Sequence, residues 1–327
     1  MGEPAGIGGE ITLKAWTERK KYRLHPFFVI GDPQWLAGID AGVAITEISS
    51  PKECAKCFRQ ALPVLPLRLA TPAVPGKPDP RNADNVLGAI RIGVKLAQSG
   101  AVSALVTNPI EKAVLYGAGF THPGHTEFLA ELTGAAKPPV MLLACPASAK
   151  DPGLRVALVS VHLPLAQVAS KLSRTQIIDT AQAAARALTQ DFGIENPRLA
   201  IAALNPHGGE QGALGREEIE IIAPAVAGLR AAGINAQGPF PADTLFHAEA
   251  RRNFDCVICM YHDQALIPLK TINFARGVNV TLGLNIVRTS PDHGVALDIA
   301  GQGIANPASL IAALHMARDI ARCRYDR

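Results

Sequence analysis

The stretch DCVICMYHDQALIPLK, residues 255–270, changes abruptly from an apolar run to polar and charged residues. The run DCVICM is typical of a buried strand, because it is short, apolar and bounded by polar groups. His262, Asp263 and Lys270 follow it, so ionisable side chains are expected at the carboxyl end of a core strand. Other runs of this kind also predict buried strands of about five to seven residues. They are HPFFVIGD, VSALVTNP, PVMLLAC, LRVALVSVH and RLAIAALNPH.

Amphipathic or alanine-rich segments between these runs predict helices. They cover residues 83–98, 126–133, 175–191, 216–232 and 307–322. Strands that alternate with helices predict an α/β protein with largely parallel strands. The proline-rich stretch 65–80 is expected to cross the surface, and residues 144–153 are expected to form a hairpin-like excursion between two strands.

Length and composition exclude several classes of protein. The 327 residues are enough for about two domains with sizeable cores, and the hydrophobic content of 48% argues against disorder. The net charge is only +4 and the basic residues are scattered, which argues against a nucleic-acid groove. No apolar run approaches the roughly 18 residues of a membrane span, and the N-terminal sequence lacks signal-peptide features. We therefore expect a cytoplasmic protein.

The six cysteines include two CxxC pairs, Cys54 with Cys57 and Cys256 with Cys259. This spacing occurs in zinc sites, so a zinc knuckle has to be considered. Cys256 and Cys259 lie in an apolar run, where positions three apart point to opposite faces of a strand, and Cys54 and Cys57 are expected on an exposed helix. We therefore favour free, reduced thiols over a zinc knuckle.

Three of the nine histidines, His162, His207 and His262, each follow a predicted strand. The carboxyl ends of strands form the ligand-binding edge of an open α/β sheet, so these side chains could converge. Three imidazole nitrogens with one open position are suited to a catalytic Zn²⁺ or a similar divalent ion. Asp243 and Asp263 are candidates for orienting a ligand histidine or transferring a proton. The alternatives are structural histidines and aspartates that cap helices or turns.

A second set of residues suggests an anion-binding site. His125 and Thr126 stand at the start of a predicted helix, whose free N–H groups and dipole favour a phosphate or carboxylate. Simple capping by Thr126 is the alternative. Lys270, Asn279 and Arg288 add two cations and an amide near one rim, with a solvated surface as the alternative for each cation.

Longer blocks of the sequence resemble known enzymes. The segments AGIGGE, residues 5–10, and HGVALDIAGQGIANP, residues 293–307, are similar to the GDGIGPE and HGSAPDIAGKGIANP segments of isopropylmalate and isocitrate dehydrogenases. Further blocks are MGEPAGIGGE, THPGHTE, VSVHLPL, LNPHGGEQGALGREE, PADTLF, MYHDQALIPLK, RGVNVTLGL and RTSPDHG. Together, and in order over nearly the whole chain, these blocks resemble the 4-hydroxythreonine-4-phosphate dehydrogenase family of pyridoxal 5′-phosphate biosynthesis.

The resemblance implies two α/β/α domains with an active-site cleft between them, as in isocitrate and isopropylmalate dehydrogenases. The first domain would comprise residues 1–124 and 286–327 and carry the NAD loops. The second, residues 125–285, would carry the metal ligands and the dimer interface. Because the family forms homodimers whose active sites take residues from both subunits, we expect a homodimer.

The resemblance also implies roles for individual residues. The ligands of a divalent metal, Zn²⁺ or else Mg²⁺ or Co²⁺, would be His162, His207 and His262. The substrate-binding residues would be His125, Thr126, Lys270, Asn279 and Arg288. Proton transfer would fall to Lys270, Asp243 or Asp263, which cannot be ranked from sequence. The NAD-binding residues, in loops without a GxGxxG motif, would be Gly6, Gly8, His293, Gly294, Asp298 and Asn306.

The implied reaction is the NAD-dependent and metal-dependent oxidation and decarboxylation of 4-phosphooxy-L-threonine to 3-amino-2-oxopropyl phosphate. The alternative within the family is a dehydrogenase of 4-phospho-D-threonate or erythronate, substrates that lack the amine. A zinc hydrolase is a third hypothesis, against which the segment 293–307 argues. A non-catalytic phosphate-binding protein is a fourth, and it would leave the three histidines without a purpose.

The N-terminal loop departs from the family pattern GDPAGIGPE. Glu3 and Gly9 replace the aspartate and the second proline, and the lost proline costs roughly 1 kcal/mol or less in preorganisation. Relatives carry a short strand before this loop, whereas the sequence starts at Met1 inside it. Either the start is truncated or upstream residues are missing from the sequence as given, and we expect a version with them restored to be more stable or more active.

Overall fold

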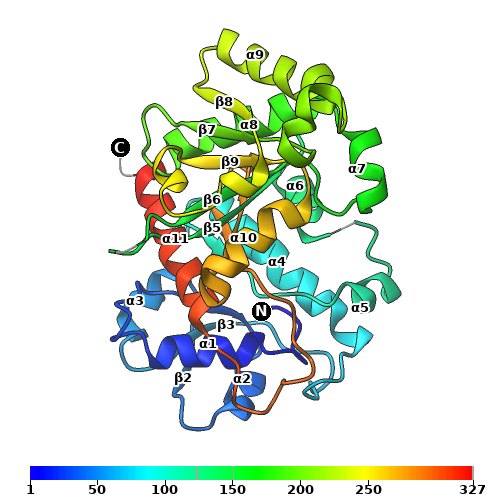
Figure 1. Cartoon of the computed structure of the whole chain (residues 1–327). Coiled ribbons are helices and arrows are strands. Elements are labelled where there is room, and N and C mark those ends of the chain that lie inside the picture. Colours follow the sequence, from blue (N-terminus) through cyan, green and yellow to red (C-terminus); the bar gives the residue numbers. More distant parts are fainter. Residues whose placement is uncertain (123, 150, 326–327) are drawn as a thin grey trace. The chain divides into compact units, whose positions relative to one another are not determined.

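The computed structural model describes residues 1–122, 124–149 and 151–325. The chain divides into two compact units, each discontinuous in sequence (Figure 1). One unit comprises Met1–Pro138 and Leu284–Ala321, and the other comprises Pro139–Gly283 and Arg322–Arg327. The expected boundary after residue 285 is two residues from the boundary of these units after Gly283, whereas residues 125–138, which were expected in the second domain, belong to the first unit.

The first unit combines a small parallel sheet, a separate strand pair and several helices. The sheet has the order β1-β3-β2, and β4 pairs in parallel with β11. The strands are β1 (Val29–Gly31), β2 (Ile45–Glu47), β3 (Leu62–Pro66), β4 (Leu105–Val106) and β11 (Arg288–Pro291). The helices are α1 (Gly8–Thr17), α2 (Pro33–Ile39), α3 (Cys54–Cys57), α4 (Ala83–Gln98), α5 (Lys112–Gly117), α6 (His125–Thr133) and α11 (Ala308–Tyr325), which belongs to this unit as far as Ala321.

Helix α1 holds the first unit together because it has apolar residues on more than one face. Leu13 and Trp16 pack with Leu62 of the small sheet in one core. Ile7, at the start of the helix, and Ile11 pack in another core that includes residues of α11, which lies above α1 in Figure 1. The beginning and the end of the sequence therefore share one core in this unit.

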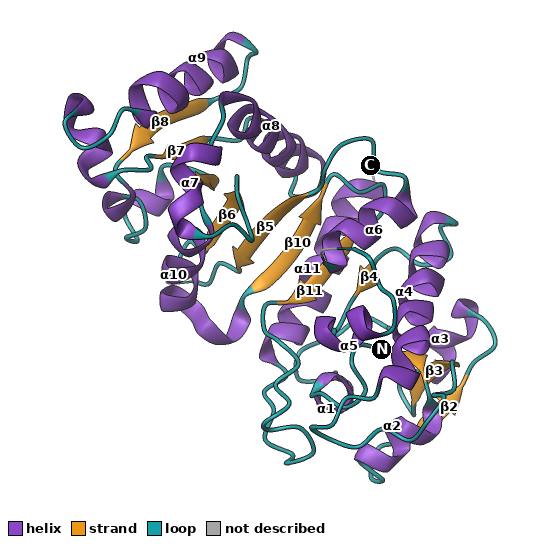
Figure 2. Ribbon diagram, turned by 90° about the vertical axis from the view of Figure 1, so that its right-hand side faces the viewer, coloured by secondary structure: helices purple, strands orange, loops and turns teal. Residues whose placement is uncertain are grey.

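The second unit is built on a larger mixed sheet with the strand order β10-β5-β6-β9-β7-β8. Its strands are β5 (Val140–Cys145), β6 (Leu154–Leu158), β7 (Leu199–Ala202), β8 (Ala236–Phe240), β9 (Cys256–Cys259) and β10 (Val278–Leu282). Its helices are α7 (Leu165–Lys171), α8 (Arg174–Gln190), α9 (Ala223–Ala231) and α10 (His262–Asn273). Helices α8 and α9 lie on one face of this sheet and α10 on the other (Figure 2). Alternate strand residues such as Val156 and Val257 pack with Leu269 of α10.

The structure confirms the α/β class and corrects parts of the sequence interpretation. Strands β1 and β4 are shorter than expected, with three and two residues. The sheet of the second unit is mixed, because β5 runs antiparallel to β10 and to β6. Strands β5 and β6 are the two strands that the predicted excursion at residues 144–153 connects. Cys54 is buried on α3, whereas we expected it on an exposed helix. None of the six cysteines forms a disulfide bond.

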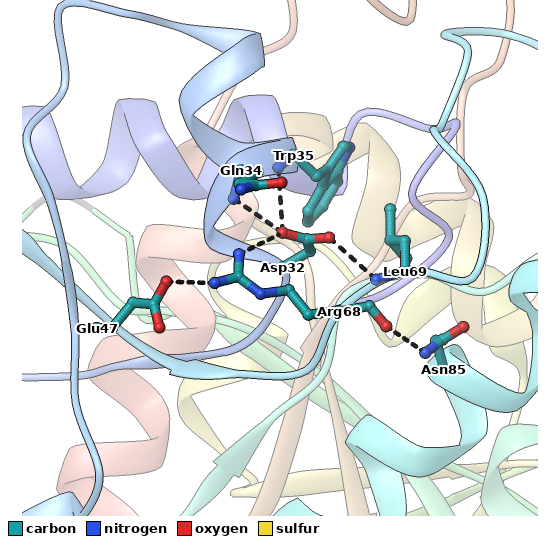
Figure 3. Close-up of polar contacts among 7 residues, drawn as sticks. All are labelled: Asp32, Gln34, Trp35, Glu47, Arg68, Leu69 and Asn85. Carbon is teal, nitrogen blue, oxygen red and sulfur yellow. Dashed lines mark hydrogen bonds and ion pairs between the residues drawn. The ribbon is translucent and has the colours of Figure 1, made fainter.

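Asp32, at the end of β1, joins three segments of the first unit (Figure 3). Its Oδ1 accepts hydrogen bonds from Gln34 N at 2.8 Å and Trp35 N at 3.4 Å, which caps α2. Its Oδ2 accepts from Leu69 N at 3.0 Å, and Arg68 Nη1 lies 3.2 Å from Oδ1. Burial alone would raise the pKa of Asp32, but the hydrogen bonds from Leu69 and Gln34 outweigh it and lower that pKa. This carboxylate therefore fixes the proline-rich stretch 65–80 onto the small sheet.

Replacing Asp32 by alanine should reduce the free energy of unfolding by roughly 2 kcal/mol, because the helix cap and the bond to Leu69 are lost together. Denaturant unfolding measures this change. The control is Asp40→Ala, which removes an exposed carboxylate that accepts from Gly42 N. Equal unfolding free energies for the two variants would contradict the assignment.

Within the parts of the chain that the structure describes, none of the helices has the length and apolar character that crossing a membrane requires.

Candidate active site

The three candidate metal ligands follow three neighbouring strands of the second unit. Strand β9 pairs in parallel with β6 on one side and with β7 on the other. His162 lies four residues beyond the end of β6, His207 five residues beyond β7, and His262 is the first residue of α10 after β9. Because these strands are parallel, the histidines follow strand ends at one edge of the sheet.

Side chains tie these strand ends to one another. Ser160 Oγ, beyond β6, donates to Met260 O, beyond β9, at 2.8 Å. Gln264 is buried; its Oε1 accepts from Met260 N at 2.7 Å and its Nε2 donates to Ala203 O, beyond β7, at 2.7 Å. These hydrogen bonds connect the ends of β6, β7 and β9, the three strands that lead to the histidines.

The donor set fits a divalent metal in kind, since imidazoles are common ligands of Zn²⁺ and similar ions. His262 Nδ1 lies 2.6 Å from Asp263 Oδ1, which leaves Nε2 as the nitrogen that could face a ligand. Among the described residues of a single chain, however, no three His, Cys, Asp or Glu side chains form a group that could hold a metal. The three-histidine metal site therefore stays a prediction.

Three further candidates also belong to the second unit. Asp243 is exposed and lies after β8, and Lys270 lies in the last turn of α10 with Nζ 5.1 Å from the Phe274 ring centre. Asn279 lies on β10, and its buried Oδ1 has no hydrogen-bond partner among the described residues. A buried amide oxygen without a partner is suited to accept a hydrogen bond from a ligand.

In the first unit, the structure brings His125 and Arg288 together, although the sequence places them 163 residues apart. Arg288 is the first residue of β11 and is 4% exposed, and its Nη2 donates to Thr107 Oγ1 at 2.6 Å. The same Nη2 lies 3.4 Å from His125 Nδ1, at the start of α6. Burial lowers the pKa of Arg288 to about 10, so the guanidinium remains charged near neutral pH.

The tautomer of His125 follows from this contact. Arginine only donates hydrogen bonds, so Nδ1 accepts and Nε2 carries the proton. Nε2 is buried and has no hydrogen-bond partner among the described residues, which leaves one N–H donor for a ligand. Gly124 is the N-cap of α6, and no described side chain caps this helix, so the alternative role of Thr126 as its cap is wrong. Arginine, imidazole and helix N-terminus together form a candidate anion-binding group.

His125 should make the stability of the protein depend on pH. Burial, and then the charges of Arg288 and Lys112, lower its pKa well below 6.5. Below pH 6.5 the unfolded chain therefore binds a proton that the folded chain does not. Stability should therefore fall as the pH is lowered, with a slope that approaches about 1.4 kcal/mol per pH unit well below that value.

The test compares His125→Asn with the unchanged protein by denaturant unfolding at pH 6.5 and at about pH 5.5. The variant should lose less stability over this interval, by about 1 kcal/mol, because the unfolded histidine is already half protonated at pH 6.5. Replacing the exposed His25 by asparagine is the control and should leave the slope nearly unchanged. The same pH slope in His125→Asn and in the unchanged protein would rule out a depressed pKa.

The expected NAD-binding segments lie side by side in the first unit. Ile7 N donates to Val295 O at 3.0 Å, and a Cβ added to Gly6 would lie 2.8 Å from the same oxygen. Glu10 Oε1 accepts from Ala305 N at 2.8 Å, and Lys14 Nζ donates to Ala305 O at 2.8 Å. Position 6 therefore requires glycine, because the loop and the 293–307 segment approach each other closely.

The other expected NAD-binding residues differ in their surroundings. Gly8 packs against the Asn108 side chain, and Gly294 is exposed. His293 is half-buried, with Nδ1 2.9 Å from Gly294 O. Asp298 is exposed, and Asn306 Oδ1 accepts from Ala308 N at the start of α11. Asn306 therefore has at least a structural role as a helix cap.

Sequence reasoning missed several residues of these sites. Thr107 and Lys112 belong to the surroundings of His125 and Arg288, and the only signal for them was their place after a predicted strand. Gln264 lies in the block YHDQ, but its bond to Ala203 depends on the pairing of two strands distant in sequence.

Comparison with known proteins gives consistent matches. The sequence profile of the pyridoxal phosphate biosynthetic protein PdxA matches residues 23–317. A 4-hydroxythreonine-4-phosphate dehydrogenase of Caulobacter vibrioides is 56% identical over 99% of this chain and 96% of that protein. One from Bradyrhizobium diazoefficiens is 48% identical over 99% of this chain and 96% of its own length.

Two solved structures are informative. The 4-hydroxythreonine-4-phosphate dehydrogenase of Klebsiella pneumoniae matches with a TM-score of 0.86 and 38% identity, covering 98% of both chains. A terephthalate 1,2-cis-dihydrodiol dehydrogenase of Burkholderia xenovorans matches with a TM-score of 0.63 and 27% identity, over 97% of this chain and 96% of the other.

The fold and these likenesses define an α/β oxidoreductase of the dehydrogenase class. Its family follows from the profile match and the identities: the chain belongs to the PdxA family of pyridoxal phosphate biosynthetic proteins.

Proposed function

We propose that this enzyme oxidises 4-phosphooxy-L-threonine with NAD⁺, giving 3-amino-2-oxopropyl phosphate, carbon dioxide and NADH. The observation that supports a phosphorylated substrate is the anion-binding group of Arg288 and His125 at the start of α6. In a dehydrogenase, a buried cation beside an N–H donor without a partner is suited to anchor a phosphate or carboxylate of the substrate.

We assign substrate contacts to His125, Thr126, Arg288, Lys270 and Asn279. His125 Nε2–H would donate to an anionic oxygen and Arg288 would neutralise its charge. The unpartnered Asn279 Oδ1 would accept from an ammonium or hydroxyl group. Protons would be transferred by Lys270, Asp243 or Asp263.

For the cofactors, we propose that Gly6, Gly8 and the 293–306 segment contact NAD. We propose that His162, His207 and His262 hold a divalent metal, Zn²⁺ or else Mg²⁺ or Co²⁺, with ligands from two copies of the chain. A bound metal would lower the pKa of the substrate hydroxyl and stabilise the enolate formed on decarboxylation. A shared site does not require a three-ligand group within either copy.

We also propose a homodimer that acts in the cytoplasm. Ile267 of α10 and Phe274 just after it are 63% and 77% exposed, and apolar side chains of this size are suited to burial against a second copy. Cysteines without disulfide bonds agree with a reducing compartment.

The test follows NADH formation with 4-phosphooxy-L-threonine and with 4-phospho-D-threonate, each with and without a metal chelator. Turnover of the amine substrate alone, lost with chelator and restored by Zn²⁺, is the expected result. Turnover of the threonate alone would assign the enzyme to the alternative reaction within the family. Full turnover of either substrate in the presence of chelator would contradict the proposed metal dependence.

A further inference from the structure

The loop that carries His207 has an unusual backbone. Five successive residues from His207 to Gln211 adopt left-handed conformations, with φ angles of 52°, 65°, 79°, 45° and 55°. Gly208 and Gly209 tolerate this conformation, but His207, Glu210 and Gln211 each have a Cβ that disfavours it by roughly 1–2 kcal/mol. Such strain persists only where surrounding contacts hold it.

Glu218 supplies contacts at the entrance to this left-handed turn. It is 4% exposed and lies in a π-helical turn, Glu218–Ile222. Its Oε1 accepts from Leu204 N at 2.8 Å and from Asn205 N at 2.8 Å. Its Oε2 accepts from Asn205 Nδ2 at 2.9 Å. One buried carboxylate therefore fixes the two residues after Ala203, at the point where the chain leaves the sheet.

The same carboxylate packs against the middle of the turn. A Cβ added to Gly209 would lie 2.6 Å from Glu218 Oε2, so the turn and the carboxylate are in close contact. Asn205 Nδ2 also donates to Glu217 Oε2 at 2.7 Å. Burial alone would raise the pKa of Glu218, but the hydrogen bonds from Asn205 outweigh it and lower that pKa, so the group is ionised at neutral pH.

We propose that Glu218 is a positioning residue: it holds the left-handed turn His207–Gln211 and thereby fixes the imidazole of His207 for metal binding. The inference rests on the proposed function, in which His207 is a metal ligand. Glu218 does not contact the metal in this scheme. It acts through the backbone, by making a strained conformation the stable one.

Glu218→Gln is the most specific test because it removes the charge and keeps the shape of the side chain. The new amide can place its N–H₂ group at Oε2, where it meets the donor Asn205 Nδ2. Rotation of the Asn205 amide by 180° relieves that conflict but places its oxygen against Glu217 Oε2. Asn205 therefore loses its hydrogen bond to residue 218 in one arrangement and its hydrogen bond to Glu217 in the other. Glu220→Gln is the control, since Glu220 lies in the same π-helical turn but is exposed and pairs with Arg216.

The experiment measures two quantities on the full-length protein: hydrogen exchange at the amides of Leu204 and Asn205, and Zn²⁺ affinity by calorimetry. In Glu218→Gln both amides should exchange faster and Zn²⁺ should bind about tenfold more weakly, while Glu220→Gln behaves as the unchanged protein. Unchanged exchange in Glu218→Gln would overturn the proposal. Faster exchange with unchanged Zn²⁺ affinity would also overturn it.

A pair of glycine variants tests the contact from the other side. Gly208→Ala and Gly209→Ala both place a Cβ at a left-handed residue, but the nearest atom to the first is Pro241 Cγ at 3.9 Å. Only Gly209→Ala places its Cβ against the Glu218 carboxylate, where it also lies 2.9 Å from Gly215 O, so it should weaken Zn²⁺ binding more than Gly208→Ala does. Equal losses in the two variants would contradict a role for Glu218.

Failure of the underlying metal assignment has a different signature. If the unchanged protein and His207→Ala bind Zn²⁺ equally, His207 is not a ligand, and the inference is overturned together with that part of the proposed function. If His207→Ala loses Zn²⁺ and Glu218→Gln does not, the metal assignment stands and only the role of Glu218 is wrong.

Discussion

His207→Ala should abolish Zn²⁺ binding and lower kcat/KM on the order of a thousandfold, while leaving the fold intact. The reason is chemical: the metal is proposed to stabilise developing negative charge on the substrate, which is worth several kcal/mol, and each 1.36 kcal/mol changes a rate about tenfold. His207 is exposed and lies outside the buried cores, so its removal leaves their packing unaltered.

Three measurements make the first prediction specific. Calorimetry reports Zn²⁺ affinity, NADH formation reports turnover, and thermal unfolding reports the fold. His25→Ala, at an exposed histidine of the first unit, is the control and should retain activity and metal. An active His207→Ala enzyme in metal-depleted buffer would overturn the metal assignment.

Arg288→Ala should raise KM for the phosphorylated substrate and lower kcat/KM roughly 100-fold, because a buried charge partner of an anion is worth about 3 kcal/mol. Arg288→Lys keeps the charge but loses the planar fork that bonds Thr107 and faces His125. It should therefore fall between the alanine variant and the unchanged enzyme.

The control for the second prediction is Arg318→Ala on α11, because Arg318 pairs with its neighbour Asp319. Steady-state kinetics with varied substrate separates KM from kcat, and a KM for NAD⁺ that stays nearly constant would show that the effect is confined to the substrate. Unchanged KM and kcat in Arg288→Ala would contradict the proposal that Arg288 and His125 bind an anionic group of the substrate.

The sequence predicted those features that depend on short-range patterns. Apolar runs ending in polar residues located β6, β7 and β9, and hence the strand-end positions of His162, His207 and His262. Strands β10 and β11 were missed, since the residues around Asn279 and Arg288 are interspersed with polar groups. The sequence therefore did not predict that these two residues lie on strands.

Other features depend on contacts between distant residues, which a sequence pattern does not contain. The adjacent glycines at 208 and 209 indicated a turn, but not five left-handed residues in succession. Glu218 looked like any other acidic residue of a helix, and its burial against Leu204 and Asn205 follows from the packing of that helix on the end of β7.

The discontinuity of the first unit affects the order in which the protein can fold during synthesis. Residues 139–283 emerge as one uninterrupted stretch, so their core can form while translation continues. The N-terminal glycine loop must wait for Val295 and Ala305, nearly 300 residues later. At about 5–20 residues per second this delay is roughly 15–60 seconds, during which the apolar residues of α1 lack part of their final core. The expected NAD-binding loop is thus synthesised nearly 300 residues before the segments that complete its packing.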